Sequence, residues 1–117
     1  MEIINLPRGC GKTTYAIIEA LKTGYPIIVG NQTMKKELKE YAKTFYSGDI
    51  IVYTISEFCD DNFWKDDDKK PEKVIIDELP LILSQILGCN CEMATITGKI
   101  FGKKKKVNNI KGWYEDC

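Results

Sequence analysis

The sequence predicts a single α/β domain: a three-layer sandwich with a mainly parallel sheet of about five strands. Short β-branched runs alternate with helical patterns along the chain, which is the order of a sheet with right-handed crossover helices. The run "PIIVGN" over 26–31 is apolar almost without interruption, as parallel strands covered on both faces usually are. A length of 117 residues suits one compact domain over 1–117 and is too short for two.

The first half of the chain predicts three strands and two helices. The strands are expected over 2–6, 26–31 and 49–55, with helices over 12–23 and from a Thr33 cap through Phe45. The first helix is apolar on most faces, and Gly24 followed by Pro26 ends it. The second helix has one apolar stripe, which starts at Met34 and recurs at helical spacing.

The second half predicts shorter elements. Ser56 is expected to cap a short helix through Phe63, before an exposed charged loop over 65–73. A strand is expected over 73–78, a helix between Pro80 and Gly88, and a fifth strand over 91–98. Residues 99–117 are basic and lack a firm period, so we expect a loop or hairpin plus a tail there, and a core over 2–98.

Composition excludes several classes of function. The formal net charge is zero, which gives no global attraction to nucleic acid or membrane. The absence of histidine from the sequence excludes histidine-based triads and histidine metal sites. The five cysteines show no CxxC spacing and are expected to be reduced thiols. With no signal-peptide pattern and no apolar run near the roughly 20 residues of a membrane span, we expect a cytoplasmic protein without membrane contact.

A glycine-rich segment, "PRGCGKTT" over 7–14, lies between the first predicted strand and helix. Gly9 and Gly11 lack Cβ atoms, so the backbone there can curl and direct several N–H groups at one anion. The positive end of the following helix also favours phosphate. Lys12 is expected to reach the β and γ phosphates of a nucleotide, and the Thr13 hydroxyl to ligate Mg²⁺. The expected nucleotide-binding residues are Arg8, Gly9, Cys10, Gly11, Lys12, Thr13 and Thr14.

An acidic pair, Asp77 and Glu78, ends the hydrophobic segment "VIIDE". Asp77 is expected to hold Mg²⁺ through a water molecule, and Glu78 to take a proton from an attacking water. The alternative is that the two carboxylates only end a strand and cap the next helix. The glycine-rich segment and the acidic pair are together far more specific than either is alone.

These two motifs resemble the Walker A and Walker B "DE" motifs of P-loop NTPases such as helicases and AAA-type ATPases, over residues 2–98. The resemblance implies ATP or GTP with Mg²⁺ as ligands and Lys12 and Glu78 as catalytic residues. It also implies Thr95 or Thr97 as a sensor of the γ phosphate.

The sequence departs from that family at several points. Leu6 stands where the first glycine of G-x-x-x-x-G-K-[ST] belongs, and the chain is too short for a second RecA-like domain. Arg8 is the only arginine and lies inside the loop, so an arginine finger must come from another protein, be replaced by a lysine or be absent. Slow hydrolysis by the isolated chain is the expected result.

A basic segment, "GKKKK" over 102–106, has two interpretations. Lys103, Lys104, Lys105 and Lys106 could contact nucleic-acid phosphates, or could form a solvated loop. The leading functional hypothesis is a Mg²⁺-dependent accessory NTPase in the nucleic-acid metabolism of a phage or mobile element. The alternative is a non-catalytic interaction protein on a P-loop scaffold that binds or inhibits a host factor. A small nucleotide kinase is disfavoured because arginines for clamping a second phosphorylated substrate are missing.

Overall fold

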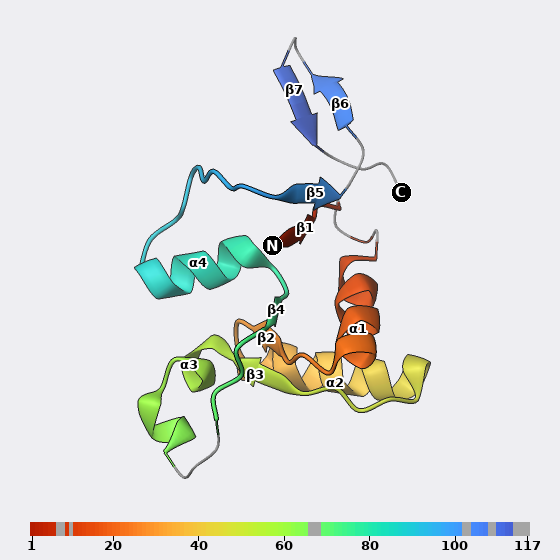
Figure 1. Ribbon diagram of the computed structural model, residues 1–117, viewed down its shortest axis with the longest axis vertical. Coiled ribbons are helices and arrows are strands. Elements are labelled where there is room, and N and C mark those ends of the chain that lie inside the picture. The colour runs from red at the N-terminus through yellow and green to blue at the C-terminus, as the bar shows by residue number, and fades with distance from the viewer. Residues whose placement is uncertain (7–8, 10, 66–68, 102–103, 108–109, 114–117) are drawn as a thin grey trace. The chain divides into compact units, whose positions relative to one another are not determined.

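The computed structural model (Figure 1) describes residues 1–6, 9, 11–65, 69–101, 104–107 and 110–113. The chain divides into two compact units, Met1–Tyr15 with Met93–Cys117, and Ala16–Glu92. The predicted α/β class and parallel sheet are confirmed, with a three-stranded parallel sheet and helices in the larger unit.

The sheet of the larger unit has β2 at its centre. Its strands are β2 (Ile27–Val29), β3 (Val52–Thr54) and β4 (Ile75–Ile76), in the order β3-β2-β4. Both pairings are parallel, and Ile27 is in register with Val52 on one side and Ile75 on the other. All three side chains of β2 are buried, as the unbroken apolar run predicts.

Four α-helices accompany these strands. They are α1 (Lys12–Thr23), α2 (Gln32–Tyr46), α3 (Ile55–Phe58) and α4 (Leu79–Leu87). The bounds of α1 are those expected from the sequence. Gly24 follows it in the left-handed region, with φ of 78°, and its N–H donates to the Ala20 carbonyl at 2.8 Å.

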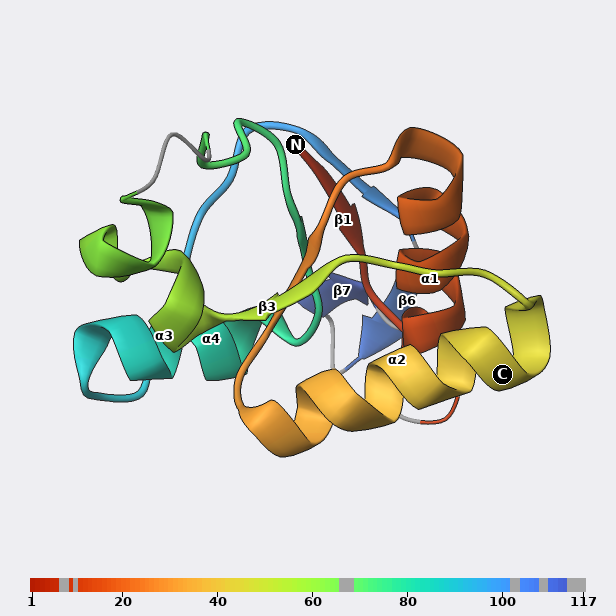
Figure 2. The ribbon, with the colours of Figure 1, turned by 90° about the horizontal axis from the view of Figure 1, so that it is seen from below.

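Alternation along β2 divides the core between two faces of the sheet. Ile27 and Val29 pack with residues of α1 and α2, whereas Ile28 packs with Ile55 of α3 and Ile82 of α4. Figure 2 shows α1 and α2 on one side of β2 and α3 and α4 on the other. The Ala16–Glu92 unit therefore has three layers, helix, sheet and helix.

Glycine lets α4 approach the end of β2 closely. A Cβ atom on Gly30 would lie 2.8 Å from Cδ2 of Leu81 and 2.9 Å from Nε2 of Gln85. A side chain at this position would require the Leu81 and Gln85 side chains to shift, so glycine lets both of them pack directly over the end of β2.

The caps of α2 and α3 differ from those expected. Asn31, not Thr33, caps α2, and its Oδ1 accepts the Met34 N–H at 2.9 Å. Asn31 has the extended backbone that an N-cap requires, so the helix begins as soon as β2 has ended. Thr54, not Ser56, caps α3, in a capping box with Glu57.

The helix expected from Ser56 through Phe63 is also shorter than predicted. α3 ends at Phe58, and a 3₁₀ helix, η1 (Asp61–Trp64), follows it. The Asp60 side chain accepts the Asn62 N–H at 2.9 Å, a local bond that competes with continuing the α-helix.

The smaller unit contains two strand pairs. β1 (Glu2–Ile4) pairs with β5 (Lys99–Phe101) in parallel, and β6 (Lys104–Val107) forms an antiparallel hairpin with β7 (Ile110–Trp113). The prediction of a strand over 91–98 is wrong, because that segment pairs with no other strand and β5 begins at Lys99. Gly98 allows the close entry into β5, since a Cβ there would lie 2.7 Å from the Met1 carbonyl oxygen.

In the part of the chain that the structure describes, no helix combines the length and apolar character needed to cross a bilayer.

An ion pair joins α2 to the start of α3. Lys35 Nζ donates to Glu57 Oε1 and Oε2 at 3.0 and 3.3 Å, and the Thr54 N–H donates to Oε1 at 2.9 Å. Partial burial raises the pKa of Glu57, but the Thr54 N–H and Lys35 outweigh it, so the net pKa is lowered.

This lowered pKa makes the contribution of Glu57 depend on pH. The stabilisation is present above the unfolded-state pKa and is lost as the pH falls through the lower folded-state pKa. Glu57→Gln keeps a side-chain acceptor for the capping box and removes the charge, so we expect it to cost about 0.5–1 kcal/mol at neutral pH. Urea unfolding of both proteins should show this difference shrinking below about pH 4. A difference that stays constant to acid pH would contradict this account of Glu57.

Candidate nucleotide site

The loop before α1 has the backbone that its glycines predict. Gly9 and Gly11 have φ of 81° and 93°, values that residues with a Cβ rarely adopt. α1 begins at Lys12, directly after Gly11, and the Tyr15 N–H donates to the Gly11 carbonyl at 3.0 Å. A strand, a turn with left-handed glycines and a helix N-terminus therefore follow one another within the first 12 residues.

Burial gives a physical reason for the missing first glycine. Leu6 is only 7% exposed, so the side chain at this position contributes to packing. Glycine here would lose about 1.5–3 kcal/mol of apolar burial. The left-handed angles lie instead at Gly9 and Gly11, the two glycines nearest the helix.

The first turn of α1 is suited to an anion. Lys12, Thr13 and Thr14 are all partly exposed there, and this fully described turn contains no acidic residue. The first N–H groups of a helix lack intrahelical acceptors and lie at the positive end of the helix dipole. Backbone N–H groups, an ammonium group and two hydroxyl groups thus occur together within one turn.

Asp77 is held in place by the sheet. Its N–H donates to the Ile28 carbonyl at 3.1 Å, so the β2–β4 hydrogen bonds continue one residue beyond β4. The side chain is partly buried and follows the carboxyl end of a parallel strand. Ligands of open parallel sheets bind at that end.

Glu78 has an unusual backbone for its position. It is the N-cap of α4 in the left-handed region, with φ of 63° and ψ of 68°. Its side chain makes no capping hydrogen bond, although its carbonyl accepts the Ile82 N–H at 3.2 Å. Capping, the alternative suggested by the sequence, is therefore not what this carboxylate does.

The predicted site residues are divided between the two units. Gly9, Gly11, Lys12, Thr13 and Thr14 follow one another in the smaller unit, whereas Asp77 and Glu78 belong to the larger one. Arg8, Cys10 and Lys103 lie outside the described residues, and the backbone of Lys104, Lys105 and Lys106 belongs to β6.

Thr95 and Thr97, the expected sensor residues, lie in a segment that forms no strand. Both residues are exposed and precede β5, whereas the expectation places them near the carboxyl end of a strand over 91–98. The alternating pattern of that segment predicts a strand, but the register with β1 starts at Lys99.

Sequence reasoning missed the polar network after β3. Thr54 is 3% exposed and exchanges hydrogen bonds with Glu57, which Lys35 also contacts. The signal was present, because "TISE" over 54–57 has the T-x-x-E pattern of a capping box.

No group of three or more Cys, Asp or Glu side chains among the described residues could hold a metal ion. Mg²⁺ is usually bound by one or two protein ligands together with substrate phosphates. Thr13, in the smaller unit, and Asp77, in the larger one, each carry an oxygen of the right chemical type.

The chain matches no protein-family model, no curated protein and no solved structure.

The backbone of Glu78 leads to a stability test. A non-glycine residue in the left-handed region costs on the order of 1 kcal/mol, and glycine removes that cost. We expect Glu78→Gly to have a free energy of unfolding about 1 kcal/mol higher than Glu78→Gln, because both variants lack the carboxylate and only glycine removes the backbone cost. Chemical denaturation measures both. A destabilised Glu78→Gly protein would show that the carboxylate supports the fold.

Proposed function

We propose that this chain is a small nucleoside-triphosphate-binding protein that uses Mg²⁺ and hydrolyses its ligand slowly. The observation that carries the proposal is the pair of left-handed glycines directly before the N-terminus of α1, with Lys12 as the first helical residue. This backbone concentrates N–H groups and positive charge on one anion. The proposal includes the finer architecture, a P-loop NTPase sandwich with a sheet of about five strands.

The residues take distinct roles in this proposal. Lys12 neutralises the β and γ phosphates, while the backbone and side chains of residues 8–14 hold the nucleotide, ATP or GTP. Thr13 ligates Mg²⁺ directly and Asp77 does so through water. Glu78 accepts a proton from the attacking water. The backbone strain at Glu78 and its lack of a capping bond support a role other than helix capping.

Slow turnover follows from the single arginine. Arginine fingers contribute roughly 10³–10⁵ in rate in related NTPases, and Arg8 within the loop is poorly placed to reach a neighbouring molecule. A protein partner that supplies an arginine would stimulate hydrolysis. The proposed setting is accessory work in the cytoplasm, in the nucleic-acid metabolism of a phage or mobile element.

A second candidate function is a non-catalytic interaction protein that binds or inhibits a host factor. The observation that favours it is the apolar surface of α4, where Ile86 and Leu87 are 58% and 57% exposed and Leu81 is 38% exposed. Exposed apolar side chains mark a protein-binding site where they form a contiguous patch. In that case nucleotide binding would be structural or absent, and substitutions of Lys12 and Glu78 would leave biological activity intact.

Nucleotide binding can be tested at Lys12. Lys12→Ala removes a charged contact to phosphate, which is worth about 1.5–3 kcal/mol, so affinity should fall roughly 10- to 100-fold. Lys22→Ala is the matched control, because Lys22 is an exposed lysine in the last turn of the same helix. Isothermal titration calorimetry with ATP and GTP, with and without Mg²⁺, measures the difference. No heat with either nucleotide would refute the proposal.

A hydrolysis assay can distinguish the roles proposed for Asp77 and Glu78. Glu78→Gln should keep nucleotide affinity and abolish turnover, whereas Asp77→Asn should weaken the dependence of binding on Mg²⁺. Phosphate release at saturating ATP and Mg²⁺ measures turnover. The unmodified chain should be slow, and tens of turnovers per second, roughly the rate of an ordinary enzyme, would contradict the expectation of slow hydrolysis.

A further inference from the structure

An open pocket lies at the end of the three-stranded sheet opposite Asp77 and Glu78. Its lining comes from three segments that each precede or begin a strand: Gly24–Pro26 before β2, Ile51 and Tyr53 at β3, and Lys69–Lys73 before β4. Because the three strands are parallel, these segments meet at the amino edge of the sheet. Asp77 and Glu78 follow the carboxyl end of β4, so the pocket is separate from the acidic pair.

Hydrogen bonds of the sheet fix the floor of the pocket. The Ile51 carbonyl accepts the Ile27 N–H, and the Pro26 carbonyl accepts the Ile75 N–H, both at 2.9 Å. The pocket has a volume of about 720 Å³, within the range of ordinary ligand sites, and it is open to solvent. An open site on a rigid edge suits an extended ligand better than an enclosed small molecule.

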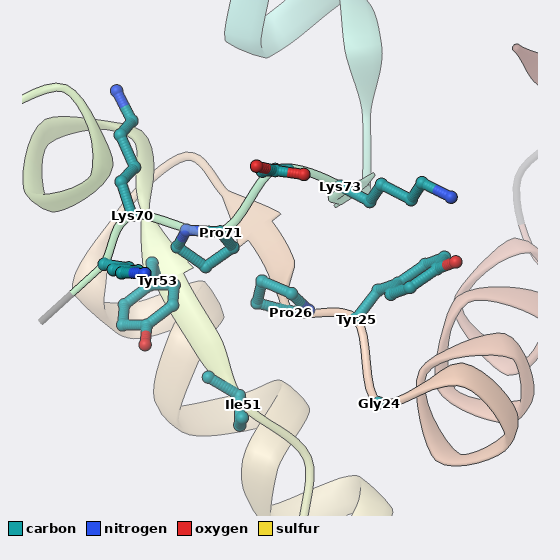
Figure 3. Close-up of a pocket in the computed structure, with 10 residues that line it drawn as sticks. Gly24, Tyr25, Pro26, Ile51, Tyr53, Lys70, Pro71 and Lys73 are labelled. Carbon is teal, nitrogen blue, oxygen red and sulfur yellow. The ribbon is translucent and has the colours of Figure 1, made fainter.

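Lysine and tyrosine side chains occur in pairs on both sides of the pocket. Figure 3 shows Tyr53 and Lys70 on one side and Tyr25 and Lys73 on the other, with Pro26 and Pro71 between them. The Lys73 ammonium lies 5.8 Å from the Tyr25 ring centroid, and the Lys70 ammonium lies 4.5 Å from that of Phe58. Cation–π contacts therefore hold positive charge beside flat aromatic surface.

The ring of Tyr53 is positioned before any ligand arrives. Trp64 and Phe63 pack edge-on against it, with centroids at 5.1 and 5.7 Å, and Phe58 lies at 6.4 Å. Trp64 is itself fixed, since its Nε1–H donates to the Phe58 carbonyl at 3.0 Å. A ligand that stacks here loses little protein side-chain entropy.

Charge decides the class of ligand. Among the described residues, three lysines and one acidic residue, Glu72, line the pocket, and this described lining favours an anion. A proline-rich peptide could use the aromatic and proline surface, but it would leave Lys69, Lys70 and Lys73 without a role. A single nucleic-acid strand uses both features, since its bases stack on aromatic rings and its phosphates contact lysines.

We propose that this amino-edge pocket binds a segment of single-stranded nucleic acid. Bases stack on Tyr25 and Tyr53, and Lys69, Lys70 and Lys73 contact the phosphates. The site is distinct from the basic 102–106 segment and does not depend on nucleotide hydrolysis.

The first test uses two single substitutions with opposite charge effects. Lys73→Gln should weaken binding of a fluorescent oligothymidylate of about 12 nucleotides, and Glu72→Gln should strengthen it. Fluorescence anisotropy over a range of salt concentrations measures both. The triple variant Lys69→Gln, Lys70→Gln, Lys73→Gln should lose roughly tenfold or more in affinity, with a salt slope smaller by up to about 2.

Matched controls separate this pocket from other basic surface. Lys36, Lys39 and Lys43 are exposed on α2, and their triple glutamine variant removes the same charge elsewhere in the same unit. A second control changes Lys104, Lys105 and Lys106 to Gln, and Lys12→Ala tests the nucleotide site. Tyr25→Leu should weaken binding roughly tenfold through lost stacking, and the lysine variants remain informative if this variant folds poorly.

A local fluorescence signal gives a second readout. Trp64 and Trp113 are the only tryptophans in the sequence, so Trp113→Phe leaves Trp64, which packs on Tyr53, as the sole tryptophan reporter. Oligonucleotide binding at the pocket should change its emission, and the Lys69, Lys70, Lys73 triple variant should remove that change.

The outcomes are decisive in both directions. Loss of binding in the pocket variants but not in the α2 or Lys12 controls supports the site. The proposal is overturned if the unmodified chain does not bind the oligonucleotide, if the α2 variant loses as much affinity, or if only the Lys104–Lys106 variant loses it. It is also overturned if a proline-rich peptide binds through Tyr25 and the oligonucleotide does not.

Discussion

The central strand β2 is the constraint on which the larger unit depends. Its three residues are buried on both faces, with Ile27 and Val29 in the core under α1 and α2, and Ile28 in the core under α3 and α4. Parallel ladders to β3 and β4 satisfy its backbone on both edges. A polar substitution in β2 would bury an unpaired polar group in one of the two cores. A shift of the strand register by one residue would move each β2 side chain to the opposite face of the sheet, and so into the other core.

The parallel register also separates two kinds of surface. α2, α3 and α4 all begin directly after a strand, with Asn31, Thr54 and Glu78 as their N-caps. One edge of the sheet thus collects helix N-termini together with the carboxylates of Glu57, Asp77 and Glu78. The opposite edge collects the segments that enter the strands, and there tyrosines and lysines predominate. The two proposed activities of this chain are therefore assigned to opposite edges of the sheet. The carboxylates that would bind Mg²⁺ lie at the carboxyl edge, and the lysines and tyrosines that would bind nucleic acid lie at the amino edge.

The sequence predicted what local patterns decide. β2 and α1 were correct because a continuous apolar run and a Gly–Pro stop do not depend on distant partners. The prediction of a strand over 91–98 was wrong because the position of a strand depends on its pairing with a distant partner. Here β1 pairs with residues from Lys99 onward. The glycine turn was predictable from its residues. The amino-edge pocket was not, because its tyrosines and lysines come from three separate segments that only the sheet register brings together.

Two non-glycine residues in the described chain have positive φ, and they have different explanations. Ser47 follows the last residue of α2, where the left-handed conformation is a common way to end a helix. Glu78 is at the start of α4, where an N-cap is normally extended, so helix geometry does not account for its φ of 63°. Small domains are only marginally stable, and a cost on the order of 1 kcal/mol is a substantial part of their folding free energy. A glycine would remove that cost but would also remove the carboxylate next to Asp77. Because helix geometry gives no reason for a glutamate in this conformation, the strain agrees with the role proposed for its carboxylate.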